Sequence, residues 1–339
     1  MSEILTSRRF FGYLGWFVLA TVSVLVICLC LGPEGMFALS ASALKFRLIR
    51  VLTAALVGAA LSAAGVTFQA LLRNPLASPS ILGVSSGASA GLIFVLFLQQ
   101  QPFPRADLAD MPPPVMALIF ALATIGIVYW LSQRRGHLDP LSLLLVGVMV
   151  SAFNGALVMV LNLMVPHGLR ADIVVWMMGK IGDSVRWGDL DDWTVLGYAA
   201  AVIGAGTLAL LSMTRQFNLQ ALGEQTARSL GVKVEFVRLA SFFAASVITA
   251  VAVAISGPIA FVGLICPHVC RMIFGSDHRV LMIASVAFGA MFLASADTAV
   301  RSLANITAGE IPVGVVTALC GGPFFIFLLR RNLRRKDLA

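Results

Sequence analysis

The stretch LVGAALSAAGVTFQALLRNPLASPSILGVSSGASAG, residues 56–91, contains two apolar segments separated by a short polar break. Arg73 and Asn74 lie in that break, and Pro75 and Pro79 follow them. A proline lacks the amide hydrogen that a helix interior needs, so these prolines end one helix before the next begins. The pattern predicts two membrane-spanning helices joined by a polar loop at the membrane surface.

The composition places the whole chain in a membrane. Of its 339 residues, 59% are hydrophobic and 12% are charged, and the mean hydropathy is +0.94, far from the balance of soluble domains. Apolar stretches of about 20 residues, long enough to cross a bilayer as helices, recur throughout. They predict an all-α integral membrane protein with one transmembrane domain over residues 1–339. Ten spans are expected, near residues 11–31, 49–71, 81–99, 113–132, 141–165, 193–213, 238–256, 258–275, 280–298 and 313–329.

The basic residues predict an orientation for these spans. If the N-terminus is inside, about two-thirds of the 24 lysines and arginines fall on the inner side, as the positive-inside rule requires. Both termini are therefore expected in the cytoplasm. The net charge of +8 follows from this topology, and no nucleic-acid partner is needed to explain it.

The sequence also contains a weak internal echo. Residues 63–83 align with residues 255–275 at a shift of 192 positions. Span two is expected to run inward and span seven outward, so a repeat that relates them would be inverted. Such a match predicts two halves of five helices with inverted topology. The matched positions are Gly65 with Gly257, Pro75 with Pro267 and Gly83 with Gly275.

Four ordered motifs carry a resemblance to a known family. Besides residues 56–91 they are SGPIAFVGLICPHVCRMIFGSDHR (residues 256–279), ADTAVR (296–301) and GEIPVGVVTALCGGPFFIFLLRR (309–331). Together they resemble the FecCD-type permeases, the membrane subunits of bacterial ABC importers for ferric siderophores, haem and cobalamin. The resemblance covers most of the chain and implies a BtuC-like type II importer fold in the bacterial inner membrane.

The resemblance also implies partners. A second permease copy or paralogue would complete the passage, two cytoplasmic ATPase subunits would bind ATP and magnesium, and a periplasmic binding protein would deliver the substrate, all in contact with membrane lipid. The sequence contains no glycine-rich phosphate loop of the Walker type, so ATP hydrolysis is expected in a separate subunit. We predict no cofactor, metal or catalytic site in this chain.

The longest inner loop, residues 218–238 (NLQALGEQTARSLGVKVEFVR), is expected to form a short amphipathic helix stopped by Gly231. In the family this position is the coupling helix that enters a groove on the ATPase; a helix that only lies at the interface is the alternative. By resemblance, the ATPase-coupling residues are Leu219, Ala221, Leu222, Gly223, Glu224, Ala227, Arg228, Leu230, Gly231 and Val232.

Three outer arginines are candidates for docking the binding protein. Arg47 and Arg50 precede span two within RLIR, and Arg301 follows span nine. Exposed arginines at a membrane entrance bind partner carboxylates through paired hydrogen bonds, and the family's corresponding arginines meet acidic residues of the binding protein. Binding of lipid headgroups is the alternative for each. Asp297, one helical turn before Arg301, is spaced for an ion pair with it.

The translocation pathway is predicted from one face of span five and from two loops. The face bears small or mildly polar groups at helical spacing, which favours either tight helix packing or, by resemblance, the pathway lining; its residues are Gly147, Ser151, Gly155, Met159 and Asn162. The inner gate of the family corresponds to Asn74 and Leu76 in one loop and to Pro140 and Leu141 in the other. Residues 166–192, with WMMG at 176–179, resemble the periplasmic gating segment.

Two other functions remain to be weighed against an importer subunit. An ion-coupled secondary transporter would need ionisable side chains in the middle of its spans, and an intramembrane hydrolase would need a nucleophile and a base brought together there. The spans show almost no such residues away from their ends. The sequence therefore favours an importer permease, with a ferric siderophore as the first cargo, and haem and cobalamin as alternatives.

Overall fold

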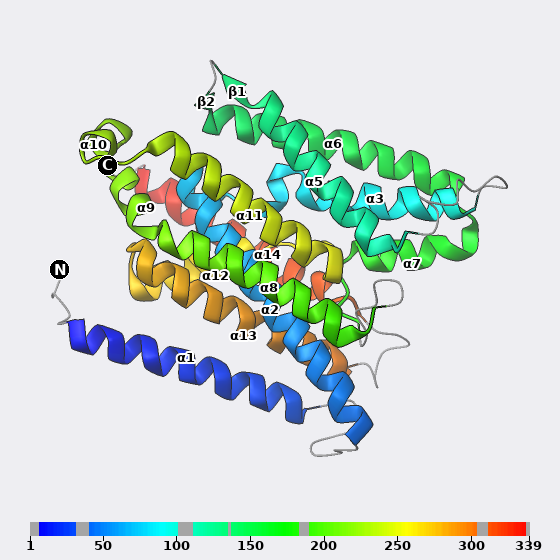
Figure 1. Cartoon of the computed structure of the whole chain (residues 1–339). Coiled ribbons are helices and arrows are strands. Elements are labelled where there is room, and N and C mark those ends of the chain that lie inside the picture. The colour runs from blue at the N-terminus through cyan, green and yellow to red at the C-terminus, as the bar shows by residue number, and fades with distance from the viewer. Residues whose placement is uncertain are drawn as a thin grey trace.

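The computed structural model of the chain describes residues 7–31, 41–100, 111–134, 137–182, 190–303 and 311–336. These residues form a bundle of helices with one short hairpin (Figure 1). The strands of the hairpin are β1 (Gln133–Arg134) and β2 (His137–Leu138). The helices are α1 (Ser7–Cys30), α2 (Ala41–Leu71), η1 (Pro79–Leu82), α3 (Val84–Gln99), α5 (Pro113–Leu131), α6 (Pro140–Met164), α7 (His167–Met177), α8 (Asp192–Ser212), α9 (Thr214–Ala221), α10 (Glu224–Ser229), α11 (Val234–Ser256), α12 (Val262–Phe274), α13 (His278–Leu303) and α14 (Val313–Lys336).

The ten predicted spans each correspond to a helix. Within the described residues, α2, α5, α6, α8, α11 and α13 are long and apolar enough to cross a membrane, and α1, α3, α12 and α14 contain shorter apolar helices. At 13 residues, α12 is about 20 Å long, less than the hydrocarbon thickness. The predicted span over residues 258–275 is therefore only partly helical, because residues 257–260 enter it as non-helical chain.

The core lies along α2, which runs through the middle of the bundle between α11 and α13 (Figure 1). Glycines let the backbones approach closely: a Cβ on Gly58 would lie 2.1 Å from the carbonyl oxygen of Gly289 in α13, and one on Gly65 would lie 1.9 Å from that of Gly263 in α12. Close contact through small residues is the usual way in which helices associate in lipid. By contrast, α6 lies at the edge of the bundle, with most of its surface exposed.

The two halves run in opposite directions. Helix α2 ends beside α9, where Arg73 Nη2 donates to the Gln220 carbonyl at 3.4 Å, whereas α11 begins directly after α10 at this same end. Each is a largely buried helix followed by a non-helical segment and a shorter helix, α3 or α12. This arrangement fits the predicted inverted five-helix halves, with α2 equivalent to α11.

The internal echo does not mark equivalent positions. Gly65 lies inside α2, whereas Gly257 follows α11 with a φ of 69°. Pro75 lies in a loop, whereas Pro267 lies inside α12. The echo therefore pairs residues of different local structure, and the repeat is visible in the order of helices rather than in the matched residues.

The polar break forms a tight loop, as predicted. Arg73 takes a positive φ of 47°, which is costly for a residue with a side chain. The side-chain oxygen of Asn74 accepts a hydrogen bond from the Leu76 amide at 3.0 Å, and Pro79 begins η1. The loop lies at the end of the bundle that carries α9, α10 and the hairpin, here called the α10 end (Figure 1).

Candidate functional site

The coupling segment differs from the single helix predicted for it. This segment, residues 218–238, contains the end of α9, all of α10 and the start of α11, and the helix is interrupted at Leu222 and Gly223 between α9 and α10. Gly223 has a φ of 121°, a conformation that side chains disfavour. The predicted stop at Gly231 is confirmed, since this residue has a φ of 82° just after α10. The positive φ of Gly223 was not predicted, because the residues around this glycine favour helix.

The surface of this segment combines apolar and charged side chains. Leu222 is 66% exposed and Leu230 is 57% exposed, and the Arg228 side chain lies exposed between them in sequence. Ala227 is fully buried, and its carbonyl accepts a hydrogen bond from the Val232 amide at 3.0 Å. Exposed leucines directly after α9 and α10 suit a protein partner. Of the other predicted positions, Ala221 and Gly231 are exposed, whereas Leu219, Gly223, Glu224 and Val232 are half-buried.

Four charged side chains connect α10 to the start of α11. Glu224 accepts from Arg228 at 2.9 Å and from Arg238 at 3.2 Å, and Arg228 also donates to Glu235 at 2.7 Å. The hydrogen bond from Arg228 is the main reason that the pKa of the Glu224 carboxyl is lowered from its ordinary value, and Arg238 adds to this. We call these four residues the α10 ion network.

The α10 ion network reaches the hairpin that precedes α6. Arg238 donates from Nη1 to the Leu138 carbonyl in β2 at 2.9 Å, and His137 lies 3.5 Å from Glu235. The next residue, Asp139, caps α6 by accepting from the Ser142 amide at 2.8 Å and its hydroxyl at 2.7 Å. These bonds lower the pKa of Asp139. A continuous set of polar contacts therefore joins α10 to the first turn of α6.

The two loops predicted as the inner gate border one cavity. Leu72 and Arg73 from one loop and Asp139 and Pro140 from the other line a space of about 450 Å³, together with members of the α10 ion network. Of the predicted gate residues, Pro140 lines it directly. Asn74 and Leu76 are half-buried and Leu141 is 67% exposed, and none of these three is among the described lining residues.

The predicted face of α6 divides into a packed part and an open part. Gly147 is buried against η1, where a Cβ would lie 2.9 Å from the Ile81 carbonyl oxygen. Ser151 donates to the Gly147 carbonyl at 2.8 Å. Further along, nothing lies within 4 Å of a Cβ on Gly155, and Met159 is 73% exposed. Tight packing therefore explains the first turns, and the face is open at Gly155 and Met159.

Asn162 and Asn154 show the polar character of the same helix. The side-chain oxygen of Asn162 is buried without a hydrogen-bond partner among the described residues. Asn154 was missed by the sequence reasoning: its Nδ2 lies 3.3 Å from the hydroxyl oxygens of Ser86 in α3 and Thr124 in α5. An asparagine inside an apolar span was the signal that could have identified this contact between helices.

The expected exposure of the outer arginines is wrong. Arg47, Arg50 and Arg301 are 6%, 3% and 6% exposed. Arg50 binds the Asp297 carboxylate through two nitrogens at 3.0–3.2 Å, and Arg301 Nε lies 3.2 Å from the same carboxylate. The predicted Asp297–Arg301 ion pair is therefore present, with Arg50 as a third member; we call the three residues the buried arginine cluster. The Nη1 atom of Arg47 is buried without a hydrogen-bond partner among the residues that the structure describes.

The predicted gating segment is described in part, since residues 183–189 lie outside the described residues. Its helix α7 ends at the WMMG motif, where Gly179 has a φ of 77° and its carbonyl accepts from the Gly314 amide at 3.1 Å. Met177 and Met178 line a cavity of about 480 Å³ with η1, α3 and α14. Sequence reasoning missed that α14, Ser80 of η1 and Ser85 of α3 line this cavity. The described lining residues are Ser80, Ser85, Met177, Met178, Pro258, Ile259, Ala260, Gly314, Val315, Ala318 and Leu319.

A family model for the FecCD transport family matches residues 16–331. The chain belongs to this family. The matched range contains the coupling segment, both gate loops and the buried arginine cluster. The chain is therefore a permease subunit of the ABC-transporter type, with a role in transport, and it is a multi-pass membrane protein.

Curated and solved FecCD relatives agree with this assignment. The cobalamin import system permease protein BtuC of Halobacterium salinarum is 39% identical over 84% of this chain and 72% of its own length. The hemin transport system permease protein HmuU of Yersinia pestis is 36% identical over 94% of this chain and 97% of its own. A solved metal-chelate-type ABC transporter in an inward-facing conformation has a TM-score of 0.78 and 31% identity, and covers 94% of this chain and 99% of that chain.

Proposed function

We propose that this chain forms half of the passage of an ATP-driven importer for a metal chelate in the bacterial inner membrane. The two relatives reported above are named for cobalamin and hemin, and the solved structure for a metal chelate. A metal chelate is the class that these names share. A ferric siderophore is the first candidate within it, and haem and cobalamin are the alternatives.

The observation that carries the proposal is the series of polar contacts that links α10 to α6 through Arg238 of α11 and the hairpin. A partner that binds the exposed leucines of the coupling segment would move α10, and Glu224 and Arg238 link α10 to the hairpin that holds α6. Because α6 is the most exposed of the six long described spans and is open at Gly155, its displacement would alter the passage. Two ATPase subunits would supply the movement from the cytoplasm, with both termini of this chain on that side, and each would bind ATP and magnesium.

The second permease subunit, identical or paralogous, is proposed to face α6. This helix carries exposed apolar side chains along its length, among them Met149, Phe153 and Met159, each at least 70% exposed. Part of that surface would meet the partner permease and part would meet lipid. The cargo would then pass along the open part of the α6 face and the cavity bordered by α7 and α14.

A periplasmic binding protein is proposed to dock at the opposite end, near the buried arginine cluster. Arg50 and Arg301 already hold Asp297, so acidic residues of the partner would have to compete with an internal carboxylate. Arg47 lies outside this cluster; it has a buried nitrogen without a hydrogen-bond partner among the described residues and is the arginine that can donate to a new carboxylate at least cost. We therefore rank Arg47 first for docking.

The proposal is tested by reconstituting the permease pair with its ATPase subunits and binding protein in vesicles. Arg238→Gln should leave the ATPase bound but lower uptake by about tenfold, because α10 loses its link to the hairpin. Arg215→Gln, which removes an exposed arginine of α9 outside the ion network, is the matched control and should keep near-normal uptake. Ferric siderophore, haem and cobalamin are compared as cargo. Uptake without any ATPase would instead support an ion-coupled secondary transporter.

A further inference from the structure

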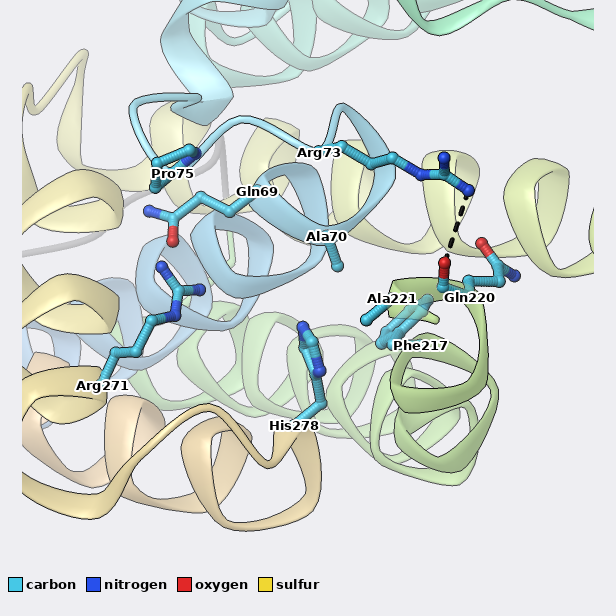
Figure 2. Close-up of a pocket in the computed structure, with 9 residues that line it drawn as sticks. All are labelled: Gln69, Ala70, Arg73, Pro75, Phe217, Gln220, Ala221, Arg271 and His278. Carbon is cyan, nitrogen blue, oxygen red and sulfur yellow. Dashed lines mark hydrogen bonds between the residues drawn. The ribbon is translucent and has the colours of Figure 1, made fainter. Parts of the chain in front are cut away.

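A second cavity at the α10 end has no role in the proposed passage. It lies between the end of α2, helix α9, and the connection from α12 to α13, and has a volume of about 310 Å³, near the lower limit for ligand pockets. Figure 2 shows the nine described residues that line it: Gln69, Ala70, Arg73, Pro75, Phe217, Gln220, Ala221, Arg271 and His278.

Gln69 is the residue that points to a missing ligand. Its side chain extends from α2 into the cavity towards Arg271 (Figure 2), and the residue is 4% exposed. Both its amide nitrogen and its amide oxygen are buried without a hydrogen-bond partner in the part of the chain that the structure describes. Buried polar groups in folded proteins are almost always hydrogen-bonded. A side chain at a cavity wall whose two polar atoms lack hydrogen-bond partners therefore indicates that a ligand binds in the cavity.

The charge of the cavity indicates what that ligand is. Arg271, in the last turn of α12, directs its guanidinium towards Gln69, and Arg73 lies on the rim, bonded to the Gln220 carbonyl (Figure 2). None of the nine described lining residues is acidic. A guanidinium in such a setting binds a planar or tetrahedral oxyanion through two parallel hydrogen bonds.

His278 adds an acceptor to this set of donors. Its ring points into the cavity (Figure 2), and its Nδ1 lies 2.8 Å from the side-chain oxygen of Asn218. That oxygen also accepts the backbone amide of His278 at 2.9 Å, so Nδ1 is the donor in the pair. In the neutral ring, Nε2 is then left as an acceptor. It suits a hydroxyl group, such as that of a protonated phosphate or a glycerol headgroup.

We propose that this cavity is a binding site for a phosphate-class anion, either inorganic phosphate or the headgroup of an anionic phospholipid. Arg271 would hold the oxyanion, the Gln69 amide would donate to it, and His278 would accept from a hydroxyl of the ligand. Basic pockets between transmembrane helices near a membrane surface are known to take phospholipid headgroups. The site would join α2 and α12 to α9, and so brace the base of the coupling segment.

The test measures thermal unfolding of the full chain in nanodiscs. One arm adds inorganic phosphate against sodium chloride at equal ionic strength; the other compares phosphatidylcholine discs with discs that contain phosphatidylglycerol. Stabilisation by phosphate alone assigns a soluble anion, stabilisation by phosphatidylglycerol alone assigns a lipid headgroup, and either supports the site. No stabilisation in either arm overturns it.

Two variants, Arg271→Gln and Gln69→Leu, and one control, Arg279→Gln, separate binding from folding. Arg271→Gln should weaken the apparent affinity by about tenfold or more, the loss expected for a hydrogen bond to a charged group. Arg279→Gln removes an exposed arginine at the same end that does not line the cavity and should change the affinity less than about twofold.

The second variant is Gln69→Leu, which replaces the unmet amide with an apolar side chain of similar size. It should abolish the ligand-induced shift while preserving or raising the melting temperature without ligand, because two unsatisfied polar atoms are removed. If Gln69→Leu lowers the ligand-free melting temperature and keeps the shift, Gln69 is structural and the site is refuted. An equal loss of affinity in Arg271→Gln and Arg279→Gln would also refute it.

Discussion

The two ends of the helix bundle both gather arginines and acids, but in opposite ways. In the buried arginine cluster, the Arg50 and Asp297 side chains are 4% and 1% exposed, whereas in the α10 ion network Arg228 and Glu235 are 53% and 36% exposed. Removal of one partner from a buried ion pair is strongly destabilising, because the other charge is left buried and uncompensated. Exposed pairs contribute little to the free energy of unfolding and are screened by salt. The first arrangement fixes helices together, and the second can rearrange when a partner binds.

The largest effect is expected at the buried cluster. Asp297→Ala leaves two buried guanidinium groups without their shared carboxylate and should cost about 3–5 kcal/mol of unfolding free energy. Glu235→Ala in the exposed network is the matched comparison and should cost less than about 1 kcal/mol. Thermal unfolding in detergent measures both. Equal losses would show that the two ends do not differ in the way proposed.

A smaller effect is expected when the whole buried cluster becomes apolar. The triple variant Arg50→Met, Asp297→Leu, Arg301→Met removes all three charges at once, and its stability should return to within about 1–2 kcal/mol of the parent. Import should be impaired if Arg50 and Arg301 also bind the binding protein. Recovery of both stability and import would restrict the cluster to a structural role and leave Arg47 as the only docking arginine of the proposal.

Salt should separate the two ends further. The pair Arg228 and Glu235 is expected to contribute about 0.2–1 kcal/mol in a double-mutant cycle. This coupling should nearly disappear at high salt, since the screening length falls from about 8 Å at physiological ionic strength to about 3 Å at 1 M. The coupling between Arg50 and Asp297 should change little. A salt-independent value for the exposed pair would show that it is shielded from solvent.

The smallest expected effect is the pH dependence of the α10 ion network. The hydrogen bond from Arg228, with Arg238, lowers the pKa of Glu224 below its ordinary value of 4.5. The ionised form is therefore favoured in the folded state, so its contribution is complete above pH 4.5 and is lost as the pH falls through the lower, folded pKa. After allowance for solvent screening we expect a few tenths of a kcal/mol. Glu224→Gln should flatten this part of the stability profile.

The helices themselves were predictable from the sequence, and the details of the site were not. The bounds of α5, α6 and α8 lie within one residue of those predicted, because the length of an apolar run is a local property, whereas α2 begins eight residues before its predicted span. The break at Gly223 was not foreseen, since a glycine within helix-favouring residues gives no sign of its φ. The division of the α6 face was also hidden, because Gly147 packs against η1 and Gly155 does not.

Family motifs identified the arginines of the buried cluster but gave a wrong environment for them. Their spacing in RLIR and ADTAVR says nothing about burial, and only the one-turn pair of Asp297 with Arg301 could be expected from spacing alone. The Arg50 partner lies 247 residues away in the chain. The position of the Gln69 amide is likewise decided by tertiary packing. It has no hydrogen-bond partner among the described residues, and it borders a cavity that residues of α12 and α13 also line.

The sequence by itself determined that this chain crosses the membrane about ten times, roughly where its apolar helices lie, and which family it belongs to. These follow from hydrophobic length and from motifs, both of which are local. The tertiary structure alone decided which charges are buried together, which remain exposed around α10, and where a cavity without acidic lining opens. The physical reason is that burial and pairing depend on neighbours brought from distant segments, and these neighbours set the cost of each polar group.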